Sequence, residues 1–226
     1  MPRLTILTGR AAPLADSGQL SGIDKTPVSA ALMLDTNGLA GDEQGDLRHH
    51  GGPEKAVHHY ARDHYAAWQA EIGDLPVLAA PGAFGENLSQ HGLTESDVAV
   101  GDIFRLGKAL IQVSQGRQPC WKLNHRFGVR DMARRVQDSG RTGWYYRVLQ
   151  PGIVAPGDDL HLIDRIAPDW TIRRLWHVMY VDRLNRHDLA QMAALDVLAE
   201  GWRRYAARRL DSGRVEDWRG RLEGST

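Results

Sequence analysis

The chain has 226 residues, and its 28 Lys and Arg side chains are matched by 28 Asp and Glu side chains. Because the net charge is zero, no overall field attracts nucleic acid or an anionic membrane, and neither partner is expected. No stretch approaches the ~18 consecutive apolar residues of a membrane helix, and the N-terminal segment lacks a signal-peptide core, so a cytoplasmic location is expected. The single cysteine, Cys120, excludes an internal disulfide and a cysteine-rich metal site, so this residue is either inert or used alone.

Up to about residue 164, short apolar segments alternate with glycine, proline and aspartate, which is typical of strands joined by turns. The spacing of Tyr65, Trp68 and Ile72 predicts a helix over residues 62–72 that lies on the sheet. Residues 1–164 are therefore predicted to form a β-rich domain with helical insertions. Its strands are expected at residues 4–8, 28–34, 103–106, 109–114 and 160–163. Three Gly-Asp pairs indicate turns rather than a repeat: Gly41-Asp42, Gly101-Asp102 and Gly157-Asp158.

After Pro168 the pattern changes to helical spacing, which predicts a C-terminal three-helix unit over residues 165–226. Asp169 is expected to cap the first helix, and Gly201 is expected to separate the second helix from the third. Acidic residues are interleaved with the arginines of this segment, which indicates solvated helix faces rather than nucleic-acid binding. The apolar residues of the three helices are Ile172, Leu175, Trp176 and Met179; Leu189, Met192 and Leu195; and Trp202, Tyr205, Ala206 and Leu210.

Cys120 is the strongest candidate for a reactive side chain. It follows Pro119 after an expected strand, and Arg117 and Lys122 are close to it in sequence. Neighbouring cations favour the thiolate, which is both a nucleophile and a soft metal ligand. A cysteine in apolar surroundings instead stays protonated and packs as a small apolar side chain. The local sequence leaves these two interpretations equally open.

A second polar cluster, residues 41–60, gathers Arg48, His50 and Lys55 around the pair Gly51-Gly52. Glycines let backbone N–H groups approach an anion, and the flanking cations supply the opposite charge, so this segment is suited to hold a phosphate. The alternative is a polar hairpin without a ligand, because neither the GxxxxGK nor the GxGxxG motif is present.

Five histidines lie in or beside the same cluster, and imidazole is a common zinc ligand. Their spacing is not that of HExxH, and adjacent histidines in an extended segment point to opposite faces, so a zinc site is the less favoured interpretation. Residues 85–89 form a third polar segment, in which Glu86 and Asn87 either bind a ligand or belong to an ordinary turn. The five histidines are His49, His50, His58, His59 and His64.

Taken in chain order, five motifs closely resemble those of the MOSC-domain proteins, and in particular of their YiiM-type branch. The resemblance covers the whole chain, with a MOSC domain to about residue 164 and the three-helix extension of that branch after it. It implies a β-barrel-like core that binds the molybdenum cofactor, in which a pterin dithiolene holds the metal and its phosphate lies among basic residues. The motifs are GDEQGDLRHHGGPEKAVHHY (41–60), FGENLS (84–89), GLTES (92–96), GDIF (101–104) and SQGRQPCWKLN (114–124).

The resemblance also implies roles for individual residues. Cys120 matches the metal-binding cysteine of the family and is the expected catalytic residue. His49 and His58 have no counterpart in the family pattern, which further weakens the case for a histidine metal site. The positions that match polar and basic motif residues of the family, and are expected to bind the cofactor, are Lys25, Arg48, His50, Gly51, Gly52, Lys55, Asn87 and Arg117.

Similar proteins reduce N-hydroxylated compounds, including hydroxylaminopurines and amidoximes, with electrons from a flavin reductase. Removing the oxygen of an N–OH group needs two electrons and an oxygen acceptor, and a molybdenum centre supplies both. The chain has no flavin or iron–sulfur motif of its own, so the resemblance implies a redox partner. Two alternatives remain open. One is a sulfur-carrier or cofactor-maturation protein with a persulfide on Cys120, and the other is a cofactor-storage protein without turnover.

Overall fold

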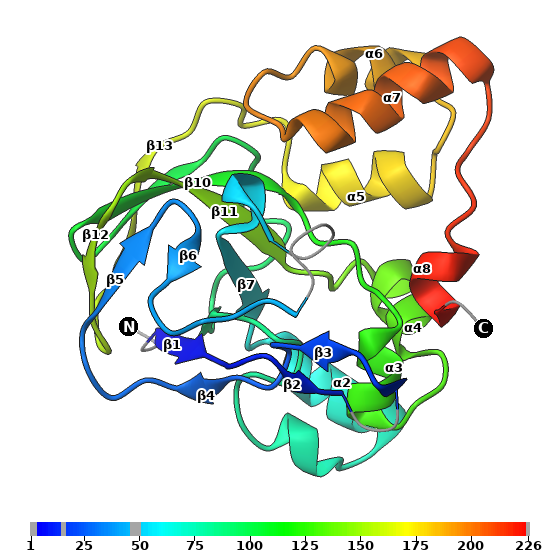
Figure 1. Ribbon diagram of the computed structural model, residues 1–226. Helices are drawn as coiled ribbons and strands as arrows, with labels where there is room; N and C mark the ends of the chain where they lie inside the picture. Colours follow the sequence, from blue (N-terminus) through cyan, green and yellow to red (C-terminus); the bar gives the residue numbers. More distant parts are fainter. Residues whose placement is uncertain (1–3, 15–16, 46–50, 225–226) are drawn as a thin grey trace.

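A curved sheet of eight strands forms the half-barrel at the centre of the fold (Figure 1). The structure is a computed structural model that describes residues 4–14, 17–45 and 51–224, so Arg48, His49 and His50 lie outside the described residues. Neighbouring strands are antiparallel except for β7 and β8, which are parallel. Across the sheet the strands are β13 (Leu160–Asp164), β9 (Ile103–Leu106), β10 (Ala109–Gly116), β11 (Trp144–Gln150), β7 (Val57–Ala61), β8 (Leu88–Gln90), β1 (Thr5–Thr8) and β4 (Thr26–Pro27).

Four of the five expected strands are confirmed, as β1, β9, β10 and β13. The expected strand over residues 28–34 is confirmed only over residues 32–34, because the chain leaves the main sheet after Pro27 and enters a second one. β4 ends at Pro27 beside β1, whereas Leu32 begins a strand that pairs with residues 152–154. The second sheet contains β12 (Gly152–Val154), β5 (Leu32–Asp35) and β6 (Gly38–Leu39), and a separate ribbon pairs β2 (Ala12–Pro13) with β3 (Leu20–Ser21).

All three Gly-Asp pairs lie at turns. Gly41, Gly101 and Gly157 have φ values of 84°, 84° and 91°, in the left-handed region that glycine enters without steric penalty. The aspartate that follows each glycine accepts a hydrogen bond from a backbone N–H group. The donor lies three residues earlier for Asp102 and Asp158, which closes the turn, and 33 residues away for Asp42. The pairs are Asp42 with Gly9, Asp102 with Ala99, and Asp158 with Ala155.

Short helices pack around a second group of buried side chains next to the sheet. The helix expected over residues 62–72 is confirmed as α2, and the ring of Tyr60 on β7 stacks on Phe84 with 3.9 Å between centroids. One helix starts at Lys122, immediately after the loop that carries Cys120. These elements are η2 (Pro53–Lys55), α2 (His64–Ile72), η3 (Pro76–Leu78), α3 (Lys122–Phe127) and α4 (Met132–Ser139).

The C-terminal unit of three helices is confirmed and packs against β10 (Figure 1). Leu175, Met179 and Trp202 of the helices belong to the same continuous apolar core as Ile111 and Val113 of β10. The helices and the sheet therefore share one core. The helices are α5 (Ile172–Tyr180), α6 (Arg186–Ala193) and α7 (Glu200–Ser212).

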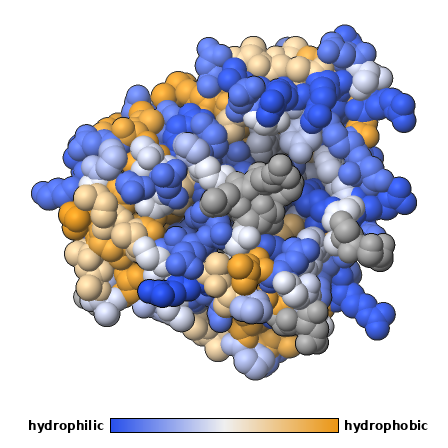
Figure 2. Space-filling view, in the orientation of Figure 1, coloured by the Kyte–Doolittle hydropathy of each residue, from blue (hydrophilic) through white to orange (hydrophobic). Residues whose placement is uncertain are grey.

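The outward side of these helices is largely hydrophilic, whereas apolar surface gathers over the strands at the other side of the molecule (Figure 2). Several arginines of the helices form ion pairs with the acidic residues interleaved among them, as expected of solvated faces. The pairs are Arg174 with Asp188 at 2.9 Å, Arg203 with Asp196 at 3.6 Å and Arg204 with Glu200 at 3.6 Å.

The first helix of this unit begins later than Asp169 would place it. Its cap is Thr171, whose hydroxyl accepts the N–H of Arg174 at 3.1 Å. The helix cannot start earlier because residues 170–171 are still extended and pair with residues 98–100. The expectation that Asp169 caps α5 is therefore wrong.

A further short helix, α8 (Arg219–Glu223), follows α7 and returns to the first part of the chain, where it packs beside α4. Its Leu222 is buried in the second group of apolar side chains. Gly201 does not separate two helices, as the sequence suggests, but lies inside α7, which ends at Gly213 with a φ of 61°. Within the described ranges, no helix is long and apolar enough to span a membrane.

Arg209 of α7 joins the last turn of α5 to the segment before α8, and its side chain is 1% exposed. The guanidinium donates to the carbonyls of Met179 at 3.2 Å and Arg183 at 3.4 Å, and to the carboxylate of Glu216 at 2.8 Å. Arg209→Met leaves all three acceptors without this donor. We expect it to lower the free energy of unfolding by about 3 kcal/mol, measured by urea denaturation.

Arg204→Met is the matched control for this prediction, because Arg204 lies on the same helix and is 69% exposed in its ion pair with Glu200. Its effect should stay below about 0.5 kcal/mol. Equal decreases in the free energy of unfolding of the two variants would show that the hydrogen bonds of Arg209 contribute no more to stability than an exposed ion pair does.

Candidate functional site

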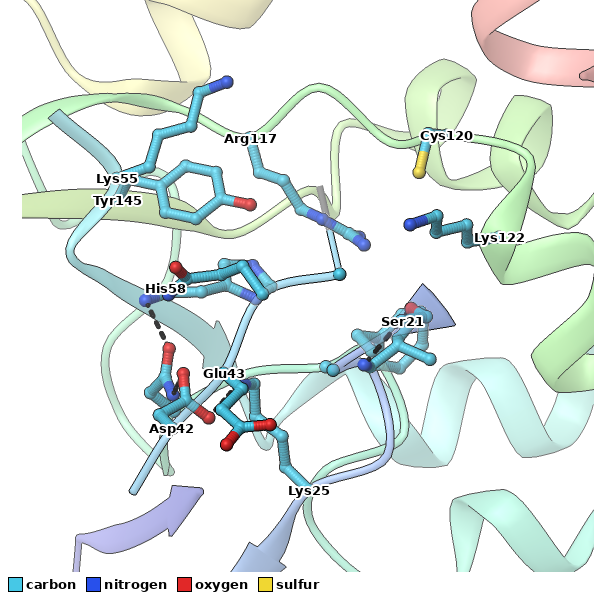
Figure 3. A pocket seen from close by; sticks show the side chains of 17 residues that line it. Ser21, Lys25, Asp42, Glu43, Lys55, His58, Arg117, Cys120, Lys122 and Tyr145 are labelled. Atoms are coloured by element: carbon cyan, nitrogen blue, oxygen red, sulfur yellow. Dashed lines mark hydrogen bonds and ion pairs between the residues drawn. The ribbon is translucent and has the colours of Figure 1, made fainter. Parts of the chain in front are cut away.

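A pocket lies between the main sheet, the loop that carries Cys120 and the segments near residues 21–25 and 42–45 (Figure 3). The lining includes Lys25, Lys55, Asn87, Arg117 and Cys120, so the structure brings together five of the residues expected to form the site. Gly51 and Gly52 precede η2 in the chain and are not part of the lining. Other polar side chains of the lining include Asp42, His58, Lys122 and Tyr145.

The thiol of Cys120 faces this pocket from the loop between β10 and α3, on the same side as Arg117 and Lys122 (Figure 3). Cys120 is 9% exposed and belongs to the lining of the pocket. A partly enclosed thiol beside cations is the setting in which a thiolate binds a soft metal. The geometry thus favours a reactive Cys120 over one that only fills apolar space.

Arg117 and Lys122 place two buried positive charges beside the thiol, with exposed fractions of 6% and 4%. Lys122 Nζ donates to the carbonyl of Leu20 at 3.1 Å. The Nη1 atom of Arg117 is buried and has no hydrogen-bond partner among the described residues. A buried guanidinium donor without an acceptor is unfavourable, so this atom marks a position suited to an anionic ligand.

Lys25 contributes a third buried cation, but this one is neutralised within the protein by Asp42. The carboxylate of Asp42 accepts from Lys25 Nζ, from Asn87 Nδ2 at 2.9 Å and from the backbone N–H of Gly9 at 2.8 Å. Burial lowers the pKa of Lys25, and the neighbouring Asp42 opposes that shift. Asp42 was expected only as a turn residue. Its carboxylate in fact organises one wall of the pocket.

Asn87 lies in the same wall and is 4% exposed. Its Nδ2 group donates to Asp42 and to the carbonyl of Leu7 at 3.2 Å, and its Oδ1 accepts the backbone N–H of His58 at 3.1 Å. Both amide protons are therefore used inside the protein. Asn87 joins β1, β7 and the Asp42 turn, which holds the wall in shape.

His58 and Tyr145 form an aromatic pair in the pocket, from opposing positions of β7 and β11. Their ring centroids are 5.0 Å apart. Burial, reinforced by Arg117, lowers the pKa of His58 well below its usual value, and burial raises the pKa of Tyr145. Both rings are therefore neutral near pH 7. His58 thus lies in the pocket lining, although the resemblance gave it no counterpart in the family pattern.

The other two described histidines of the cluster, His59 and His64, have different surroundings. His59 stacks on Trp144 with 4.5 Å between ring centroids, and burial lowers its pKa to about 3. His64 Nε2 lies 2.6 Å from a carboxylate oxygen of Glu95. Neighbours in β7 thus point to opposite faces, as expected, and no group of three metal-binding side chains occurs among the described residues.

Glu86 does not bind a ligand in the pocket, because its carboxylate is used to hold a turn. It is fully buried and accepts from Tyr65 Oη and from the backbone N–H groups of Gly82 at 2.8 Å and Phe84 at 3.0 Å. Of the two interpretations open for residues 85–89, the turn is the one that applies to Glu86.

The half-barrel, the helical unit and a pocket lined by a thiol and several cations define a class of protein, and comparisons with known proteins identify it. The MOSC domain family matches residues 46–161, and the family described as YiiM-like, 3-alpha helix domain matches residues 170–213. The chain is 44% identical to protein YiiM of Escherichia coli over 92% of each chain. It therefore belongs to the MOSC-domain proteins of the YiiM type.

Solved structures agree with this assignment. The crystal structure of YiiM from Escherichia coli covers 99% of this chain with a TM-score of 0.84 and 36% identity over the superposed residues. The structure of YiiM from Geobacillus stearothermophilus covers 91% of the chain, with a TM-score of 0.78 and 34% identity. A longer protein of Gibberella moniliformis named reductase is 36% identical over 194 residues, which make up 85% of this chain and 34% of that protein.

Proposed function

We propose that the protein is a molybdenum-cofactor-dependent reductase that removes oxygen from N-hydroxylated compounds such as hydroxylaminopurines and amidoximes. Membership of the MOSC family and the relative named reductase support an oxidoreductase. The observation that carries the proposal is the pocket itself, where one thiol lies beside Arg117, whose buried Nη1 has no acceptor among the described residues.

The residues of the pocket fit a cofactor that combines a soft metal with a phosphorylated pterin. Cys120 would supply the protein thiolate to the metal, and Arg117 and Lys122 would bind the phosphate through charge-assisted hydrogen bonds. When bound, the cofactor supplies the two electrons and the acceptor for the oxygen. His58 and Tyr145, both neutral, would line the pocket against a planar heterocycle without adding charge.

Three other residues of the site, Asp42, Asn87 and Lys25, bind one another. Asp42 and Asn87 hold β1, β7 and the pocket wall in register, and Lys25 balances the charge of Asp42. Electrons would come from a flavin reductase partner, because the chain has one cysteine and no dinucleotide-binding fingerprint. A cytoplasmic location is part of this proposal.

The decisive experiment is elemental analysis and pterin detection on protein produced in a host that makes the molybdenum cofactor. We expect near-stoichiometric molybdenum and pterin, together with reduction of an amidoxime when a reduced flavin reductase is added. Protein from a host unable to make the cofactor is the control.

Other outcomes of the same experiment point to other functions. A persulfide on Cys120 without metal, seen by mass spectrometry, would replace the proposal by sulfur transfer. Bound metal without any turnover would instead support a role in cofactor storage. Absence of both molybdenum and pterin would refute cofactor binding.

Arg117→Ala is expected to weaken cofactor retention roughly 10- to 150-fold, because a charge-assisted contact contributes about 1.5–3 kcal/mol. Molybdenum content after gel filtration and dialysis measures this loss. Thermal stability of the metal-free protein should fall little, since the guanidinium Nη1 that the variant removes has no acceptor in the described part of the chain.

Arg105→Ala is the matched control, because Arg105 is exposed on β9, away from the pocket lining. It should keep its full molybdenum content. If Arg117→Ala retained the metal as well as Arg105→Ala does, the phosphate would have to lie elsewhere.

A further inference from the structure

One residue of α8, Arg221, bonds to the peptide groups on both sides of Cys120. Its Nη1 donates to the carbonyl of Pro119, and its own carbonyl accepts the N–H of Trp121 at 2.8 Å. Arg221 is not among the residues that line the pocket. Its contacts are to the backbone that carries the thiol.

These two contacts restrain the direction of the Cys120 side chain. The carbonyl of Pro119 belongs to the peptide plane before Cys120, and the N–H of Trp121 belongs to the plane after it. Peptide groups are planar, so the relative orientation of two successive planes is set by φ and ψ of the residue between them. A hydrogen bond to each plane therefore restricts φ and ψ of Cys120, and with them the direction of its Cα–Cβ bond.

Arg221 is itself held in place. Its Nη2 donates to Gln137 Oε1 of α4 at 2.6 Å, and the next residue, Leu222, is 3% exposed. The carbonyl of Leu222 accepts from Asn124 Nδ2 of α3 at 2.9 Å. The short helix α8 is thus bonded to both α3 and α4, and these contacts keep Arg221 in place beside the loop that carries Cys120.

We infer that Arg221 is a positioning residue, which sets the orientation of the Cys120 thiol toward the pocket by fixing the two peptide planes beside it. The helices of the C-terminal unit contribute no ligand to the pocket. Through Arg221, the segment that follows the three helices nevertheless orients Cys120, the residue proposed to bind the metal. The inference rests on the proposed function of Cys120. The hydrogen bonds from which it is argued do not depend on that function.

The test uses metal-free, full-length protein and the rate at which iodoacetamide alkylates the thiol. The chain has one cysteine, so this rate reports on Cys120 alone. Arg221→Ala is expected to speed alkylation about five- to tenfold, because losing one hydrogen bond raises the population of locally open loop states by about this factor. Arg221→Lys keeps one donor for Pro119 and should give an intermediate rate.

Two controls separate positioning from general stability. Arg219→Ala changes the same helix at a residue that is 76% exposed and paired with Asp217, and it should leave the rate unchanged. Leu189→Ala removes buried volume in α6, far along the chain from the loop, and supplies a variant with a lowered melting temperature. If Leu189→Ala accelerates alkylation as much as Arg221→Ala does, the effect is global and the inference is overturned.

A wild-type alkylation rate in Arg221→Ala also overturns it. Should Arg221→Ala fail to fold, Gln137→Ala gives a milder perturbation, because it removes only the anchor of the guanidinium. It should then speed alkylation in the same direction and by a smaller factor, and an unchanged rate counts against the inference. Since no metal is involved, failure here is distinct from failure of the proposed function, which is judged by molybdenum content.

Discussion

Cys120→Ser is expected to abolish reductase activity while the protein folds normally. Serine preserves the size of the side chain but replaces a soft anionic ligand with a hard neutral hydroxyl. Mutating a residue that only hydrogen-bonds to a metal ligand already lowers metal affinity or activity about 10–100-fold. Loss of the ligand itself should therefore lower activity by at least about 100-fold. Turnover with an artificial electron donor and molybdenum content are the two measurements.

Ser21→Ala is a suitable companion to this variant, because Ser21 also lines the pocket but carries no charge and no metal-binding group. It should retain most of the metal. The melting temperature of the metal-free Cys120→Ser protein should match that of the wild type within the scatter of repeated scans. Full activity in Cys120→Ser would end the metal-ligand assignment.

Truncation at residue 164 is the second change with a large expected effect, and the truncated protein should be poorly soluble or lose its cooperative unfolding transition. The core of the sheet continues into α5, α6 and α7. Each buried Leu, Ile or Met side chain contributes about 1.5–3 kcal/mol, and several of them together equal the ~5–15 kcal/mol that stabilises a whole domain.

The contact between Trp202 and Gly116 illustrates this loss. A Cβ atom at Gly116 would lie 3.2 Å from the indole of Trp202, so the ring packs directly on the backbone just before Arg117. Removing the helices therefore disturbs the pocket as well as the core. Activity should fall with an artificial donor and with the protein partner alike.

The opposite pattern would assign the helices a different role. If turnover with the artificial donor survived truncation while partner-driven turnover collapsed, the helices would serve to dock the electron donor rather than to cover the core. Measuring the two activities on the same preparation distinguishes these outcomes.

Sequence patterns predicted the elements whose periodicity is long or regular. The strands β9 and β10 follow from short apolar segments between turn residues, and the three C-terminal helices follow from the helical spacing of apolar residues. The central strand β7 was not expected, because its sequence VHHYA reads as polar although all five residues are buried. Burial keeps His58 and His59 uncharged, so they behave as aromatic side chains inside the sheet.

The pocket was predicted only in part for a related reason. Motifs identified Cys120, Arg117 and Lys25, which lie in segments with recognisable chemistry. Tyr145 reaches the pocket only because β11 pairs with β7 in one register, and no local sequence pattern encodes a pairing between strands so far apart. The helices α3, α4 and α8 are five to eight residues long, too short for a periodic pattern to be distinctive.

The bond between Arg221 and Pro119 has a consequence for the order of events during protein synthesis. Its two residues are 102 positions apart in the chain. At about 5–20 residues per second, the ribosome adds Arg221 roughly 5 to 20 s after Pro119. During that interval the loop with Cys120 exists without the residue that holds its peptide planes. The fully restrained thiol therefore exists only after the polypeptide beyond the three helices has been made.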